Sequence, residues 1–178
     1  MKAYAIFLLV LAACIGCDAR KAPHRAWTYT EDKMYPDGIV VAAVVKAEEW
    51  AADEPARTTR EYSVTIDDHS ESVGLFKGEI NRAVRVHGVI ILAAYSEFSI
   101  RSLDGAWVHV AANTTAELHQ HGISFAPSVQ QFTNKWNWLE IVDIDPAGRA
   151  IILQERKDKT PFCIGFDETG RNLEFRSH

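Results

Sequence analysis

Apolar and polar positions alternate along most of the chain after Gly38, in short runs that turn-forming residues separate. Alternation with a period of two places apolar side chains on one face of a β-strand, and Gly, Pro, Asn and Asp between such runs mark hairpins. This pattern is typical of antiparallel β-structure. The runs predict strands over residues 39–47, 60–67, 73–78, 82–95 (with a bend or break at Gly88), 97–102, 106–112, 123–127, 129–134, 136–144, 149–156, 161–166 and 171–177.

Three turn sequences support the hairpins. In DPAG (145–148), Pro146 suits the φ of about −65° in a type I turn, and Gly148 suits a positive φ. DETG (167–170) repeats this plan, and LDG (103–105) offers the Asp and Gly of a tight hairpin. The first two turns lie in matching segments, IDPAGRAIIL and FDETGRNLEF, so the chain repeats a hairpin.

We therefore predict an all-β fold, mainly an antiparallel meander of hairpins that forms a sandwich or a rolled sheet. A small propeller-like repeat is the alternative, because the hairpins recur. A propeller needs at least four blades of about 40 residues, however, and residues 18–60 do not fit one.

Two short helices interrupt the predicted strands. Residues 47–54 (AEEWAADE) are rich in Ala and Glu and precede Pro55. In residues 113–122, Thr114 and Glu117 have the spacing of a capping box, and a glycine ends the segment. Each helix would have one or two turns.

The first residues have the composition of a secretory signal. One lysine precedes an apolar stretch that is too short to span a bilayer, which needs about 20 residues. The stretch ends in Leu11-Ala12-Ala13-Cys14, which resembles the lipobox of bacterial lipoproteins. The resemblance implies removal of residues 1–13 and acylation of Cys14, so that acyl chains hold the protein on a membrane.

Cys17 is the alternative lipidation site, although it lacks the aliphatic residue three positions upstream. In bacterial lipoproteins of this type, an aspartate directly after the lipidated cysteine favours the inner membrane. Asp18 would hold that place after Cys17, whereas Ile15 follows Cys14. We expect lipidation at Cys14 and a periplasm-facing position on the outer membrane.

The remaining chain divides at Gly38. Residues 14–37 are polar beyond the cysteines and predict a lipidated N-terminus and linker, and residues 38–178 predict a single β-rich domain. Cys163 lies in an apolar run, which favours a buried thiol, and a disulfide to Cys17 is the alternative in an oxidising compartment.

The charge of the chain bears on its partners. The sequence has 19 basic and 24 acidic residues, a formal net charge of −5, with no clustered basic segment. Nucleic-acid binding calls for a basic face, so we do not expect a nucleic-acid partner. No motif indicates a cofactor.

Histidines and carboxylates offer two weak candidate sites. His119 and His121 could ligate a metal from a strand, with His109 and His87 as further ligands, but on a helix side chains two residues apart diverge by about 200°. Residues 67–72 (DDHSES) could serve acid–base chemistry, although such residues also form turns where a strand ends.

No nucleophile elbow, phosphate-binding glycine loop or zinc-protease motif occurs in the sequence. A Ser-His-Asp triad can still assemble from distant residues. We therefore expect no enzyme, with a dispersed catalytic site as the alternative.

Trp136 and Trp138 alternate with a polar residue in the run FTNKWNWLEI, so both rings would share one face of a strand. If that face is buried, they belong to the core. If it is exposed, they form an anchor of the kind that dominates protein interfaces.

These observations favour an envelope lipoprotein that acts by binding a protein, and an immunity or inhibitor protein against a toxin or hydrolase fits best. A structural or assembly lipoprotein is the first alternative, and a small envelope hydrolase is the second. Asp67, Asp68 and His69 in one concave pocket would favour the hydrolase. An exposed patch at Trp136 would favour binding.

Overall fold

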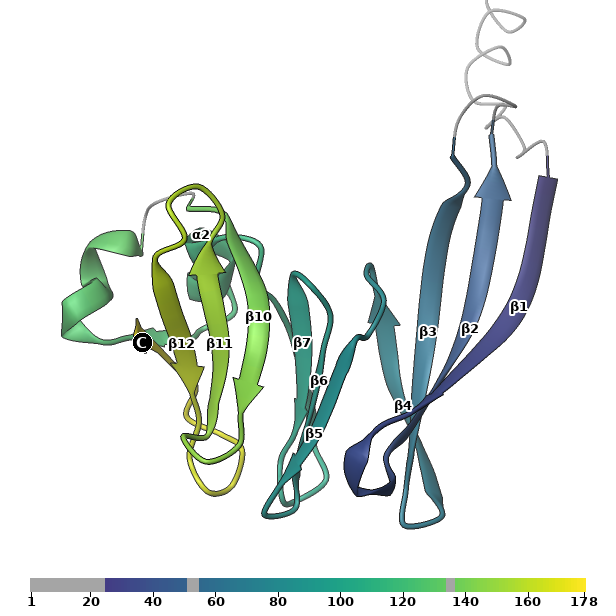
Figure 1. The fold of residues 1–178 in the computed structure, drawn as a ribbon, viewed down its shortest axis with the longest axis horizontal. Coiled ribbons are helices and arrows are strands. Elements are labelled where there is room, and N and C mark those ends of the chain that lie inside the picture. The colour runs from purple at the N-terminus through teal and green to yellow at the C-terminus, as the bar shows by residue number, and fades with distance from the viewer. Residues whose placement is uncertain (1–24, 51–54, 134–136) are drawn as a thin grey trace, which may run out of the picture. The chain divides into compact units, whose positions relative to one another are not determined.

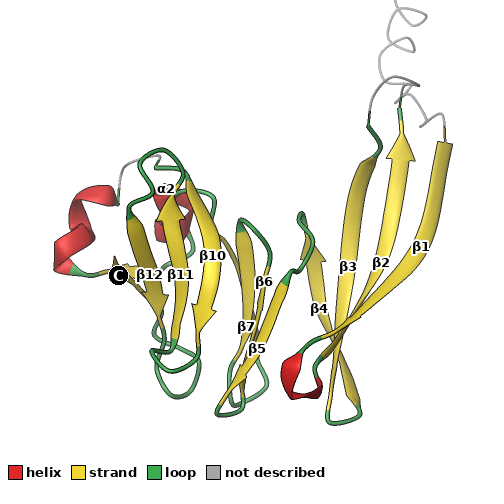
Figure 2. Cartoon of the chain, in the orientation of Figure 1, coloured by secondary structure: helices red, strands yellow, loops and turns green. Residues whose placement is uncertain are grey.

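The computed structural model describes residues 25–50, 55–133 and 137–178 (Figure 1). These residues form mostly antiparallel strands with a few short helices, which confirms the predicted all-β fold (Figure 2). The predicted signal peptide, Cys14, Cys17 and Trp136 lie outside the described residues. None of the helices within the described ranges has the length and apolar character that a membrane span requires.

The strands belong to three sheets, and each sheet contains a meander of four consecutive strands. The first sheet has the order β1 (Arg25–Met34), β2 (Val40–Glu49), β3 (Arg57–Ile66) and β4 (His69–Phe76). The second has β5 (Arg82–Val86), β6 (Val89–Ala93), β7 (Glu97–Arg101) and β8 (Trp107–Ala111). The third has β10 (Leu139–Asp145), β11 (Ala150–Glu155), β12 (Pro161–Gly165) and β13 (Glu174–Ser177), and β9 (Ser124–Phe125) adds to β13 in parallel.

The described residues form three sheets, one more than a two-sheet sandwich has. Each sheet contains a four-stranded meander, as a propeller blade does, but three sheets are fewer than the four blades that a propeller needs. The repeated hairpins both lie in the third sheet, where DPAG joins β10 to β11 and DETG joins β12 to β13. Among the described residues, three short helices interrupt the strands: η1 (Pro36–Gly38), α2 (Thr115–Gln120) and η2 (Pro127–Phe132).

The middle sheet contributes to two apolar cores. One buried cluster joins its side chains to those of the first sheet, and a second joins them to those of the third. In β6 the odd residues Val89, Ile91 and Ala93 belong to the second cluster, and the even residues Ile90 and Leu92 belong to the first. A strand buried on both faces needs apolar residues at every position, which explains the unbroken run VIILA.

Tight turns separate the strands largely as predicted. The run over 82–95 breaks into β5 and β6 at His87 and Gly88, which both have positive φ. Gly105 and Gly170 also have positive φ, but at DPAG the positive φ falls on Arg149. Gly148 is needed for another reason, since a Cβ atom there would clash with the Asp145 carboxylate.

Two predictions about helices and strands are wrong, and one is confirmed. Residues 47–49 continue β2 rather than start a helix, because the buried Ala47 extends the alternation that packs this strand; residues 51–54 of that predicted helix lie outside the described residues. Residues 129–132 belong to η2 rather than to a strand, since Pro127 begins a helical turn. The helix after Thr114, with its capping box, is confirmed as α2.

The predicted linker over residues 14–37 contains β1, which is exposed at every residue. A strand without a buried face shows no alternation, so the sequence pattern did not indicate it. The described residues divide into two compact units. The first unit holds residues 25–27, 47–50 and 55–57, and the second holds residues 28–46, 58–133 and 137–178.

Candidate binding surface

A surface of the second unit brings together a tyrosine, a tryptophan and an arginine from separate parts of the chain. Tyr95 lies in the turn between β6 and β7, Trp138 directly precedes β10, and Arg156 directly follows β11. The backbone sets their proximity, because the Arg156 amide donates to the Trp138 carbonyl at 2.8 Å and the Ile141 amide donates to the Tyr95 carbonyl at 2.8 Å. Tyr95, Trp138, Arg156 and Lys157 are named the Arg156 patch below.

Arg156 contacts both aromatic rings of the patch. Its guanidinium carbon lies 4.9 Å from the centroid of the Tyr95 ring and 5.8 Å from that of Trp138. Its Nε donates to the Leu139 carbonyl at 3.2 Å, which holds the guanidinium in place. Tyr95 and Trp138 remain 48 % and 55 % exposed, so the patch presents aromatic residues and an arginine held against them to solvent.

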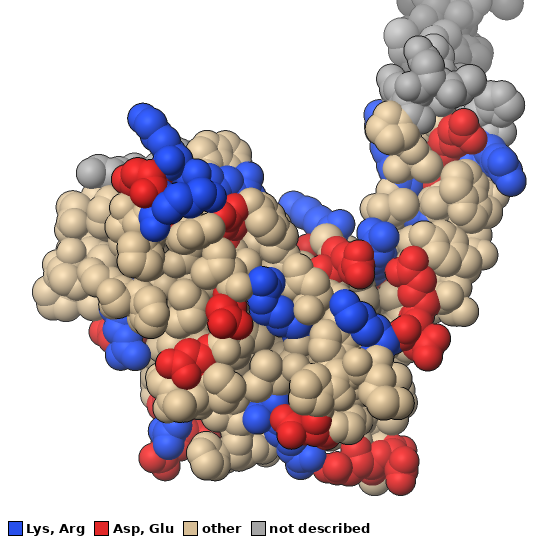
Figure 3. Space-filling view, viewed as in Figure 1, with Lys and Arg blue, Asp and Glu red and all other residues tan. Residues whose placement is uncertain are grey.

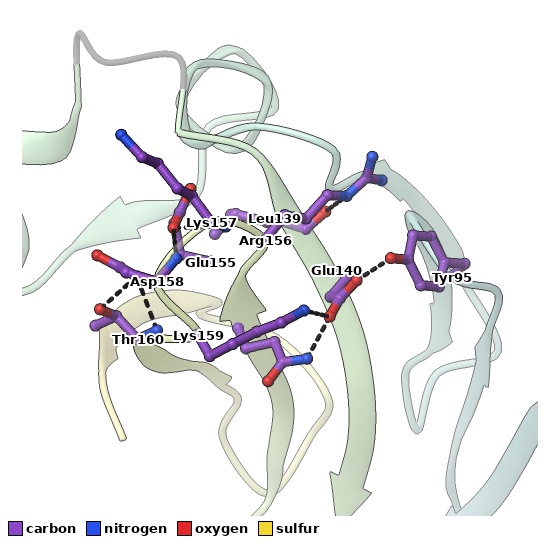
Figure 4. Close-up of polar contacts among 10 residues, drawn as sticks. Tyr95, Leu139, Glu140, Glu155, Arg156, Lys157, Asp158, Lys159 and Thr160 are labelled. Carbon is purple, nitrogen blue, oxygen red and sulfur yellow. Dashed lines mark hydrogen bonds and ion pairs between the residues drawn. The ribbon is translucent and has the colours of Figure 1, made fainter.

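The buried carboxylate of Glu140 supports the patch through hydrogen bonds. This carboxylate is buried, and it accepts hydrogen bonds from the Tyr95 hydroxyl and from Gln154 Nε2 (Figure 4). Lys159 Nζ lies 2.8 Å from its Oε1. The bond from Lys159 lowers the pKa of Glu140 and outweighs burial, which would raise it. The carboxylate therefore stays ionised near neutral pH and orients the Tyr95 hydroxyl and Lys159.

The hairpin between β11 and β12 carries the cations of the patch. Glu155 Oε2 accepts the amides of Lys157 at 2.9 Å and Asp158 at 2.8 Å, and Asp158 in turn accepts from Thr160 (Figure 4). Lys and Arg side chains gather over this hairpin (Figure 3). Trp138, Glu155, Arg156 and Lys157 line a shallow hollow of about 400 Å³. Arg156 and Lys157 thus place two positive charges at this hollow, beside the carboxylate of Glu155.

Of the two tryptophans predicted to share a face, Trp138 is exposed and Trp136 lies outside the described residues. Tyr95, Glu140 and Arg156 were not predicted as site residues. Their meeting depends on the pairing of Glu140 with Gln154 and of Leu139 with Glu155 in the ladder between β10 and β11. Trp138 is the one residue of the patch that the sequence had indicated.

A second polar hollow, of about 360 Å³, is lined by Ile66, Asp67, His69, Glu71, Arg85, Gly88, Ile90 and Arg101. Two of the three residues of the hydrolase criterion, Asp67 and His69, are thus present, and Asp68 is not among the lining residues. The charges are paired, since Asp67 lies 2.9 Å from Arg85. The Arg101 guanidinium donates twice to Glu71 at 2.7 Å and holds the pKa of that carboxyl below its ordinary value.

A serine, a histidine and a glutamate also form one chain of contacts on the second sheet. Ser99 Oγ lies 3.1 Å from His109 Nδ1, and His109 Nε2 lies 3.3 Å from Glu97 Oε2. Ser99 is 0 % exposed, and both ring nitrogens of His109 contact the protein. A nucleophile must reach its substrate, which a buried Ser99 hydroxyl does not. We interpret the three residues as a cross-link between β7 and β8. Glu97 also accepts the Gly78 amide at 2.7 Å.

The candidate metal ligands lie in different surroundings. The ring of His119 packs edge-on against Phe125 with centroids 5.9 Å apart, whereas His121 Nε2 accepts the Ala111 amide at 3.2 Å. Within residues 25–50, 55–133 and 137–178, no three His, Cys, Asp or Glu side chains are grouped to hold a metal ion. Cys163 is buried in β12, where Arg176 Nε donates to its sulfur at 3.4 Å.

No family model, no curated protein and no solved structure matches this chain. The Arg156 patch is therefore interpreted from its own chemistry.

Proposed function

We propose that this protein is an envelope lipoprotein, acylated at Cys14 and facing the periplasm from the outer membrane, that binds another protein through the Arg156 patch. If Cys17 carries the lipid, the inner membrane is the expected location. The observation that carries the binding proposal is the guanidinium of Arg156 held against the exposed rings of Tyr95 and Trp138. Trp, Tyr and Arg are the residue types most enriched among those that dominate binding energy at protein interfaces.

The partner should present carboxylates beside an apolar ridge. Arg156 uses Nε within the protein, and its terminal nitrogens have the fork geometry that pairs with a carboxylate. Lys157 adds a further positive charge on the same hairpin. Blocking an acidic site on a toxin or hydrolase fits this chemistry, so we propose an immunity or inhibitor role.

The experiment is capture from an envelope extract with the full acylated protein, compared with a Trp138→Ala/Arg156→Ala variant. We expect the wild type to retain a secreted toxin or hydrolase and to inhibit its activity, and the variant to do neither. Trp27→Phe serves as the control, because Trp27 belongs to the other unit. Equal capture and inhibition by all three proteins would contradict the proposal. Capture of peptidoglycan or an assembly complex without inhibition would support the structural alternative instead.

A small envelope hydrolase is the second candidate, because Asp67 and His69 line one hollow. Its test is a hydrolase screen of the purified protein beside an Asp67→Asn/His69→Gln variant. Hydrolysis that this variant loses and the Trp138→Ala/Arg156→Ala variant retains would favour the enzyme over the binding protein.

A further inference from the structure

The first unit presents two tryptophans, each contacted by an arginine. The guanidinium carbon of Arg25 lies 5.2 Å from the Trp27 ring centroid, and that of Arg57 lies 5.7 Å from the Trp50 ring centroid. The rings are 38 % and 37 % exposed. Trp27 lies on β1, which is exposed at every residue, and Trp50 directly follows β2.

The position of this unit in the chain limits its distance from a lipid on Cys14. Arg25 is the eleventh residue after Cys14. A fully extended chain spans at most about 3.6 Å per residue, so Arg25 stays within about 40 Å of the lipidated residue. If Cys14 carries the lipid, the first unit therefore stays close to the bilayer, and Trp27 and Trp50 can reach it often.

The residue types suit the boundary between lipid and water. Tryptophan is enriched at membrane interfaces, because its ring is apolar and its N–H still finds a hydrogen-bond partner. Arginine forms paired hydrogen bonds with phosphate. Glu48 and Glu49 lie beside Trp50, so the unit is not a general polycation, and contact depends on the rings and on individual phosphates.

We propose that Trp27 and Trp50 insert into the headgroup region of the phospholipid bilayer that holds the lipid on Cys14, with Arg25 and Arg57 paired to headgroup phosphates. This proposal rests on the acylation included in the proposed function. The first unit then acts as a second membrane contact, which restricts how the anchored protein moves on the bilayer.

The test is fluorescence quenching of the mature acylated protein in vesicles of phosphatidylethanolamine and phosphatidylglycerol with brominated acyl chains. Bromine quenches only tryptophans close to the bilayer, and the chain has 5 of them. We compare Trp27→Phe/Trp50→Phe with the matched control Trp107→Phe/Trp138→Phe. Quenching should persist in the wild type and the control and should be largely lost in the first variant.

The outcomes separate this proposal from the function on which it rests. If the protein lacks acyl mass or does not sediment with vesicles, the anchor is refuted and the membrane contact with it. If the acylated protein sediments with vesicles but its quenching is absent, or equal in the two variants, the membrane contact alone is refuted and the anchor stands. Circular dichroism checks that each variant is folded.

Discussion

Two surfaces of this molecule pair tryptophan with arginine, and they differ in what holds the arginine. Arg156 contacts two rings, donates to the Leu139 carbonyl and lies beside a tyrosine that the buried Glu140 orients. Arg25 and Arg57 each contact one ring, and among the described residues no hydrogen bond of their side chains is present.

The contacts that hold each arginine indicate what each surface is suited to bind. Side chains that are already ordered lose less entropy on association, so the Arg156 patch suits a protein partner of defined shape. An arginine that contacts a single ring can pair with phosphates in several positions, which suits a fluid bilayer. The second ring contact, the bond to the Leu139 carbonyl and the buried Glu140 thus distinguish two surfaces that both pair tryptophan with arginine.

The largest expected effect is on affinity for the protein partner. Trp138→Ala/Arg156→Ala should weaken binding by at least about 2 kcal/mol, roughly 30-fold in Kd, because it removes the centre of the patch. Trp27→Phe/Trp50→Phe should leave this affinity unchanged in detergent. Interferometry with the captured partner measures the affinity of each variant. Equal weakening by the two variants would show that the two surfaces do not differ in protein binding.

The next effect concerns the support of the patch. Glu140→Ala leaves Lys159 and the Tyr95 hydroxyl without their acceptor and should lower the free energy of unfolding by about 1–3 kcal/mol. The control is Glu168→Ala, since Glu168 is exposed and pairs with Arg149 at 3.4 Å. An exposed pair contributes at most about 1 kcal/mol. Urea unfolding measures the free energy of unfolding of both variants. Equal losses would show that the buried Glu140 stabilises the protein no more than an exposed carboxylate does.

Acid should weaken the contacts of two buried carboxylates, Glu140 in the support of the patch and Glu97 on β7. The bonds that Glu140 and Glu97 accept, from Lys159 and from His109 and Gly78, outweigh burial and hold the pKa of both carboxyls below the ordinary value in the folded state. The unfolded chain therefore binds protons first as pH falls. The stabilisation is present above the ordinary carboxyl pKa of about 4.3 and is lost as pH falls through the folded pKa.

Urea unfolding between pH 7 and pH 3 measures this loss. Glu140→Gln should flatten part of the dependence, because an amide does not titrate. A profile that Glu140→Gln leaves unchanged would contradict the assignment to this residue.

The smallest effect concerns the arginines themselves. Arg25→Gln/Arg57→Gln should change the free energy of unfolding by less than about 1 kcal/mol, since exposed cation–π contacts are weak. Arg156→Gln should cost about 1–2 kcal/mol, because it loses two ring contacts and a backbone hydrogen bond. Thermal unfolding of both variants gives the order, and the reverse order would contradict the contrast between the two surfaces.

Local patterns in the sequence were enough to predict most strands and turns. The break at Gly88 and the capping box of α2 are confirmed, since glycine in a turn and Thr with Glu three residues later act through their immediate neighbours. The exposed β1 was missed because it has no buried face. The sequence did not predict that three sheets share two apolar cores. That arrangement depends on packing between residues far apart in the chain, which periodicity does not reveal.

The candidate surface was predictable only at Trp138. Its residue type made it a candidate, but its exposure depends on how β10 begins. Tyr95 and Arg156 are far apart in the sequence and meet through strand register and one backbone bond from Ile141. No local signal connects them, so the sequence could indicate Trp138 but not the residues that surround it.

On the function proposed above, the Arg156 patch, and not the first unit, binds protein. The most direct measurement is photo-crosslinking in intact cells, with a benzoylphenylalanine residue placed at position 138 or at position 27 of the full-length protein. We predict a discrete protein adduct from position 138 and none from position 27. A protein adduct from position 27 with none from position 138 would contradict the account.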